Sequence, residues 1–140
     1  MKTAIVFGAT SGIGKEISEL LLKDGYKVAI TGRRLKKLEA LKNQYSNQVY
    51  IVQNDIQKVD EVENVFNKII KEFTTIDLII QSSGVGHINP TLAWDKEEET
   101  IFTNVVGATK LYDLSFNLFR NQGFGHLVGI TSIASIRGNR

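Results

Sequence analysis

Short apolar runs alternate with helical patterns along the whole chain. Five runs are apolar at nearly every position and short enough to be strands: residues 3–7, 27–31, 49–53, 76–80 and 125–131. Between them, apolar residues recur at helical spacing over residues 14–23, 35–45, 59–73 and 96–121. Strands that are apolar on both faces are typical of parallel sheets covered by helices on both sides. The pattern therefore predicts strands and helices in strict alternation.

This alternation predicts an α/β fold with a doubly wound, Rossmann-like parallel sheet, because right-handed helical crossovers join parallel strands. We expect the strand order 3-2-1-4-5, with a switch point between the first and fourth strands. Ligands of such sheets bind at the carboxyl ends of the strands near that point. We find no internal repeat and no linker, so residues 1–140 are treated as one domain.

Composition narrows the classes of function only slightly. The hydrophobic fraction of 42% and the charged fraction of 23% are ordinary for a globular protein, and a net charge of +2 favours no nucleic-acid partner. There is no cysteine, so neither disulfides nor thiolate metal sites are expected, and we predict no metal centre. No apolar run is long enough to span a membrane. Met1 and Lys2 lead directly into a strand, so we expect no signal peptide and a cytoplasmic location.

The loop after the first strand is rich in glycine. Gly8, Gly12 and Gly14 have the spacing G-x-x-x-G-x-G between a strand and a helix. Glycines let the backbone approach a pyrophosphate closely, and a helix N-terminus offers free N–H groups to an anion. The alternative is a tight strand-to-helix turn without a ligand. The cofactor-binding residues predicted here are Gly8, Thr10, Ser11, Gly12, Ile13 and Gly14; the two hydroxyls would either cap the helix or hold ribose and phosphate.

The end of the second strand bears on the choice of dinucleotide. An NAD-binding site usually has Asp or Glu here for the ribose hydroxyls, but this chain has Gly32, followed by Arg33 and Arg34. A guanidinium matches a 2′-phosphate in geometry and charge. The sequence therefore predicts NADP(H) in preference to NAD(H). The alternative is that the two arginines merely begin a basic surface helix.

Four more motifs stand at the ends of later strands or in the last helix: Gln53-Asn54-Asp55, Gln81-Ser82-Ser83-Gly84, Phe102-Thr103-Asn104-Val105-Val106-Gly107 and Ile130-Thr131-Ser132. With the glycine loop, they resemble the short-chain dehydrogenase/reductase family over nearly the whole chain. The match is weakest after the fourth strand, where the family has asparagines and an alanine before the glycine. The resemblance implies reversible hydride transfer between a nicotinamide and the carbonyl or alcohol carbon of a small molecule.

The resemblance also implies roles for single residues at the cofactor. Asp55, which Ile56 follows, would accept a hydrogen bond from the adenine amino group, and capping of the next helix or turn is a compatible role. The small residues Ser82, Ser83 and Gly84 would let the backbone pass against the cofactor.

Two catalytic roles follow from the same resemblance. Ser132 would orient and polarise the substrate carbonyl, with Ser135 as a second candidate. Asn104 would hold a water and steady the active-site lysine, or would simply bond to backbone and bend its helix. His87 could shuttle protons near the nicotinamide but is more simply an inert loop residue, and Tyr112 is expected to pack.

The family's Tyr-x-x-x-Lys pair would follow shortly after the serine, beyond Arg140. We therefore expect this chain to be the N-terminal piece of a longer enzyme, truncated before the remaining strands and inactive by itself. The alternative is a non-catalytic NADP(H)-binding module or sensor; a Rossmann-like epimerase is a third hypothesis. The last helix has apolar residues on more than one stripe, which predicts a homodimer or homotetramer.

Overall fold

The computed structural model describes residues 1–137, without the side chain of Ser135. The strands are β1 (Thr3–Phe7), β2 (Lys27–Gly32), β3 (Val49–Gln53), β4 (Leu78–Gln81) and β5 (His126–Gly129). The α-helices are α1 (Gly12–Lys23), α2 (Leu35–Tyr45), α3 (Val59–Glu72), α4 (Trp94–Ile101) and α5 (Ala108–Gln122). Three shorter helical segments are η1 (Ser46–Gln48), η2 (Phe102–Gly107) and η3 (Ile133–Ser135).

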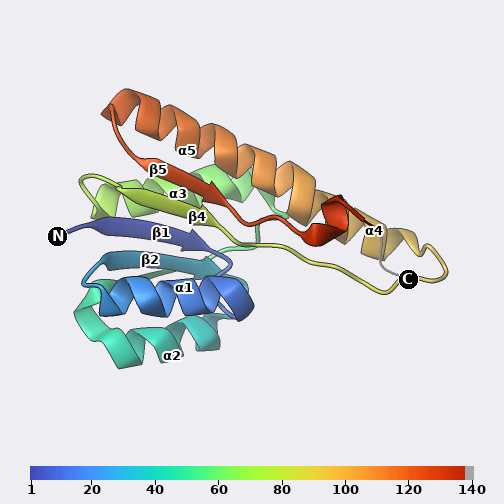
Figure 1. Ribbon diagram of the computed structural model, residues 1–140, viewed down its shortest axis with the longest axis horizontal. Helices are drawn as coiled ribbons and strands as arrows, with labels where there is room; N and C mark the ends of the chain where they lie inside the picture. Colours follow the sequence, from blue (N-terminus) through green and yellow to red (C-terminus); the bar gives the residue numbers. More distant parts are fainter. Residues whose placement is uncertain (138–140) are drawn as a thin grey trace.

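The five strands form one parallel sheet in the order β3-β2-β1-β4-β5, which confirms the predicted topology. Phe7 at the end of β1 is in register with Thr31 of β2 and Gln81 of β4. The carboxyl ends of the strands therefore lie along one edge, the edge from which the loop to α4 extends (Figure 1).

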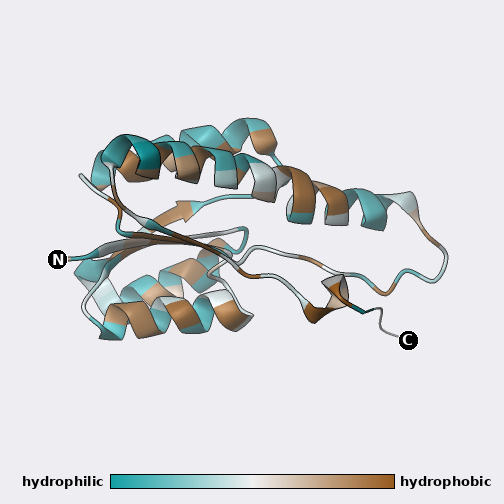
Figure 2. Ribbon diagram, turned by 45° about the horizontal axis from the view of Figure 1, so that its top comes forward, coloured by the Kyte–Doolittle hydropathy of each residue, from teal (hydrophilic) through white to brown (hydrophobic). Residues whose placement is uncertain are grey.

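Two hydrophobic clusters pack on opposite faces of the sheet. Along β1, Ala4 and Val6 belong to a cluster with α1 and α2, whereas Ile5 and Phe7 belong to a cluster with α3 and α5. Side chains alternate between faces along a strand, so a strand that is apolar at every position contributes to both clusters. Figure 2 shows the hydrophobic sheet between the two layers of helices.

Some predicted element boundaries differ from the structure. The fourth strand begins at Leu78 rather than at 76, because the backbone of Ile76 bonds to the side chain of Gln122. The fifth strand is shorter than residues 125–131, because Gly125 has a φ of 141° and packs on Phe119. The first helix begins at Gly12 instead of 14.

The helix predicted over residues 96–121 is not one continuous α-helix. It begins at Trp94 and is interrupted by the π-helical segment η2 before α5 follows. At the end of this segment, a Cβ on Gly107 would collide with the carbonyl oxygen of Ile56. Apolar spacing did not reveal the π turn, because apolar residues recur through it as they do in the flanking helices. Within residues 1–137, no helix is both long and apolar enough to cross a membrane.

Candidate functional site

The three glycines of the loop between β1 and α1 have different structural roles. Gly8 has a φ of 85°, and a Cβ there would lie 2.6 Å from the backbone nitrogen of Ser83. Gly14 packs against the carbonyl of Gly8. Gly12 has a φ of 55°, and no described atom lies within 4 Å of where its Cβ would be. Gly8 and Gly14 thus allow close packing, while Gly12 leaves the start of α1 open.

Arg34 holds the hydroxyl groups of this loop. Its Nε and Nη2 donate to Thr10 Oγ1 at 3.1 and 2.7 Å, and Nη2 also donates to Ser11 Oγ at 2.6 Å. Ser11 is the N-cap residue of α1, but its side chain makes no capping hydrogen bond. The free N–H groups at the start of α1 therefore remain available to an anion.

Gly32 and Arg33 stand at the end of β2, beside the same loop. A Cβ on Gly32 would lie 2.5 Å from the Cγ2 of Thr10, so a larger residue there would require Thr10 to shift. Arg33 Nη1 donates to Glu99 Oε1 on α4 at 3.0 Å, and about half of the Arg33 side chain is exposed. Arg33 is thus held by a residue of α4, whereas Arg34 is bound to the loop between β1 and α1.

After β3, three successive residues line the site in different ways. Asp55 Oδ1 accepts from the backbone N–H of Gln57 at 3.1 Å, which is the turn-capping role foreseen beside its adenine role. Ile56 is buried and contacts Gly107. Asn54 is also buried, and its Oδ1 has no hydrogen-bond partner within the described part of the chain.

Gln81 fixes the loop after β4. This buried side chain accepts from the N–H of Ser83 at 2.9 Å and donates to the carbonyl of the same residue at 3.1 Å. The Gln81 amide therefore bonds both the N–H and the C=O of Ser83. The glutamine that departs from the family pattern has an observed structural role, which the sequence alone did not indicate.

Asn104 in η2 makes a similar bridge to Val85. Its Oδ1 accepts from the Val85 N–H at 2.9 Å, and its Nδ2 donates to the Val85 carbonyl at 2.7 Å. Asn104 is exposed and its partner is backbone, in agreement with the second of the two roles considered for it from the sequence. The neighbouring Thr103 is the buried residue, and its Oγ1 has no partner among the described residues.

Ser132 follows β5 and is exposed at the start of η3. Its Oγ accepts from the N–H of Ala134 at 3.1 Å. The side chain of Ser135 lies outside the described part of the structure. Tyr112 packs its hydroxyl against Gly129, in agreement with the expected packing role.

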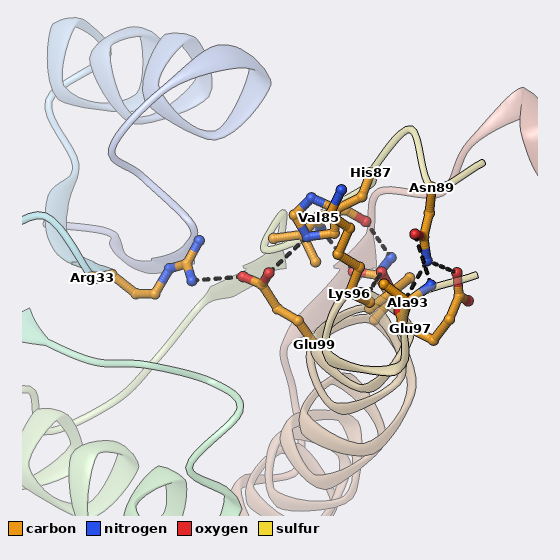
Figure 3. A network of polar contacts seen from close by, with 10 residues as sticks. Arg33, Val85, His87, Asn89, Ala93, Lys96, Glu97 and Glu99 are labelled. Carbon is orange, nitrogen blue, oxygen red and sulfur yellow. Dashed lines mark hydrogen bonds and ion pairs between the residues drawn. The ribbon is translucent and has the colours of Figure 1, made fainter. Parts of the chain in front are cut away.

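His87 and Arg33 meet on Glu99, as Figure 3 shows. The His87 Nε2 lies 2.7 Å from Glu99 Oε2, while Arg33 bonds to Oε1. The hydrogen bond from Arg33, followed by that with His87, holds the pKa of the Glu99 carboxyl below its usual range. Glu99 is thus an anion that joins α4, the loop after β4 and the end of β2.

These strand-end loops enclose one cleft of about 310 Å³. The residues that line it are Gly8, Thr10, Ser11, Gly12, Ile13, Gly32, Arg33, Arg34, Asn54, Asp55, Ile56, Ser82, Ser83, Gly84, Val85, Thr103 and Ile130. Every residue predicted to bind the cofactor is among them except Gly14, which packs against the carbonyl of Gly8. Asn104 and Ser132 do not line the cleft; each lies within two residues of one that does.

The family model described as short chain dehydrogenase matches residues 2–140. The chain belongs to the short-chain dehydrogenase family. An uncharacterized oxidoreductase of Myxococcus xanthus is 32% identical to it over 142 residues, which cover 98% of this chain and 56% of that protein. A second, from Staphylococcus haemolyticus, is 33% identical over 139 residues, covering 96% of this chain and 59% of the relative. The chain thus spans little more than half the length of these two relatives.

Solved structures agree with this membership in the short-chain dehydrogenase family. Serine dehydrogenase from Escherichia coli superimposes with a TM-score of 0.89 at 26% identity, covering 98% of this chain and 65% of that one. ElxO, solved with NADP bound, gives a TM-score of 0.86 at 26% identity, and the match covers 99% of this chain and 58% of that one. Short-chain dehydrogenases bind a nicotinamide cofactor at the carboxyl ends of such a sheet.

Sequence reasoning did not select four residues that shape this short-chain dehydrogenase site: Asn54, Gln81, Thr103 and Glu99. The first three are buried polar residues. In the sequence each stands beside another polar residue, so their burial could not be distinguished from a polar loop. Glu99 carried no signal either, since it stands in an acidic run on the surface of a helix.

Proposed function

We propose that the protein is an oxidoreductase that transfers hydride between NADP(H) and the carbonyl or alcohol carbon of a small molecule. The cleft carries this proposal. Segments that follow all five strands border it, and a Cβ at Gly8 or Gly32 would collide with a neighbouring loop. Asn54 Oδ1 and Thr103 Oγ1 are buried without partners among the described residues, and both residues line the cleft. A polar ligand in the cleft would supply those partners.

The residues present fit a dinucleotide. The open N–H groups at Gly12 and Ile13 suit a pyrophosphate, because the N-terminal end of a helix attracts anions. Asp55 and Ile56 would border the adenine, and the segment Ser82–Ser83–Gly84 would lie along the nicotinamide side. When bound, the cofactor supplies or accepts the hydride.

Two features favour NADP(H) over NAD(H). Gly32 stands where a carboxylate would bind the ribose hydroxyls, and Arg33 lines the cleft beside it. Among solved relatives at 26% identity, serine dehydrogenase was determined in complex with NADP+ and ElxO with NADP bound. We infer that Arg33 binds the 2′-phosphate, while Arg34 orients the hydroxyls of Thr10 and Ser11.

In the catalytic step, Ser132 would donate a hydrogen bond to the substrate oxygen as negative charge develops there. Asn104 would act by positioning, because it holds the backbone of Val85 at the cleft wall. We further propose a cytoplasmic location and a homodimer or homotetramer.

The cofactor assignment is tested by Arg33→Ala in the complete gene product. Loss of a charge-assisted hydrogen bond to the 2′-phosphate should weaken NADPH binding by about 1–3 kcal/mol and leave NADH binding nearly unchanged. Titration of cofactor fluorescence measures both affinities. Lys36→Ala is the matched control, because it removes a positive charge from the exposed start of α2.

Equal losses for NADPH and NADH in Arg33→Ala would contradict the proposed preference. Turnover is measured separately, as NADPH oxidation against a panel of aldehydes and ketones. Tight NADPH binding without turnover of any carbonyl would favour the alternative, a binding module or sensor.

A further inference from the structure

Arg33, the residue proposed to bind the 2′-phosphate, already has an anionic partner. Glu99 Oε1 accepts from Arg33 Nη1 at 3.0 Å, although the two residues are separated by 66 positions in the chain. Arg33 lines the cleft, whereas Glu99 lies outside the lining and contacts Arg33 from α4. The carboxylate therefore stands beside the group that an incoming phosphate would need.

Glu99 is held from two sides (Figure 3). Its second oxygen lies 2.7 Å from Nε2 of His87, in the loop after β4. If Arg33 turned to another anion, His87 would still hold the Glu99 side chain in place. Arg33 has the freedom for such an exchange, because its side chain is 51% exposed, against 27% for Glu99.

We propose that Glu99 is a specificity-determining residue that competes with the cofactor's 2′-phosphate for Arg33. This inference rests on the proposed NADP(H) function of the cleft. A phosphate must displace Glu99 from Arg33 and then remain near a carboxylate of like charge. NAD(H), which lacks the 2′-phosphate, brings no additional anion to Arg33, so neither effect reduces its binding free energy. Glu99 therefore reduces the preference for NADP(H) that Arg33 creates.

The experiment compares Glu99→Gln with the wild type in the complete gene product, by titration with NADPH and NADH. Glutamine keeps the size of the side chain and removes its charge. We expect NADPH affinity to rise roughly two- to fivefold, the factor that an exposed ion pair supplies. NADH affinity should not rise.

Two further variants separate this effect from a general change in charge. Glu98→Gln alters the net charge equally on the same helix, at an exposed neighbouring position, and should change neither affinity. In an Arg33→Ala background, Glu99→Gln should improve NADPH binding less than in the wild type, because only the like-charge repulsion is left once the guanidinium is gone. Equal gains in the presence and absence of Arg33 would overturn the proposal.

The outcomes also distinguish this proposal from the proposed function. If Arg33→Ala weakens NADPH binding but Glu99→Gln leaves it unchanged or weakens it, the role of Glu99 is wrong and the cofactor assignment stands. If Arg33→Ala affects NADPH and NADH alike, the cofactor preference itself is wrong and Glu99 has no competitor there.

Discussion

Gln81 and Asn104 each hold a backbone segment at the edge of the cleft with two hydrogen bonds. A side-chain amide has both a donor and an acceptor, so it can satisfy the N–H and the C=O of a single residue that has no strand partner. A carboxylate could make only one of these bonds and an aliphatic side chain neither. The polar residue types at these positions thus follow from the backbone that they support.

Replacing Ser132 in the complete gene product should change turnover and cofactor affinity differently. Ser132→Ala should lower turnover by about 10²–10³-fold, the scale for one donor to a developing oxyanion, while cofactor affinity stays near that of the wild type. The physical reason is that this hydrogen bond strengthens in the transition state. Steady-state rates and cofactor titrations measure the two quantities.

Ser132→Thr is the control for the serine, since it keeps a hydroxyl that can accept from the Ala134 N–H. It should retain more activity than the alanine variant. Turnover of Ser132→Ala close to the wild-type value would show that another donor acts on the substrate, and Ser135 would be the next residue to replace.

Neighbouring strand-end loops pack directly against one another. The β1 loop contacts the β4 loop at Gly8 and the end of β2 at Gly32, where Thr10 fills the space of a side chain. A carboxylate at position 32, the usual device for NAD, would therefore need Thr10 to move. At this position the cofactor preference and the packing of two elements are coupled.

We predict that Gly32→Ala lowers the free energy of unfolding by about 1–3 kcal/mol, as overpacking in a close contact does. Adding Thr10→Ser should recover part of the loss, because serine lacks the Cγ2 but keeps the hydroxyl that accepts from Arg34. Urea unfolding measures both. Gly86→Ala, where no described atom lies within 4 Å of the new Cβ, is the control and should be nearly neutral. Full stability of Gly32→Ala would show that the loops adapt freely.

For the whole molecule, the α4–η2–α5 helix presents an apolar surface on the side away from the sheet core. Its exposed fractions are 41% for Phe102, 57% for Val105 and 62% for Phe116. Tyr112 and Phe119 of the same helix are half-buried. Exposed large apolar side chains along one helix favour association with another surface.

We therefore predict a homodimer or homotetramer in light scattering of the complete gene product at tens-of-micromolar concentration. Val105→Glu should shift the mass toward the monomer, because association would bury the new charge. Leu20→Glu places the same charge at a position of 62% exposure on α1 and should not. A monomeric wild type, or equal effects of the two variants, would contradict the prediction.

The sequence by itself determined the order of elements, the parallel sheet with its strand order, and the loops that border the cleft. It could do so because strand and helix periods are local and because the carboxyl ends of parallel strands share one edge. Gly8, Gly12 and Arg33 could be placed at that edge from these rules alone.

Only the tertiary structure decided how those loops contact one another. Gly107 of the π turn packs against Ile56 in the loop after β3, and the partner of Arg33 comes from a helix 66 positions away. The buried atoms Asn54 Oδ1 and Thr103 Oγ1, which have no hydrogen-bond partner within residues 1–137, are likewise defined by surrounding elements. Such contacts depend on distances between segments that are remote in the chain, and a periodic pattern carries no information about those distances.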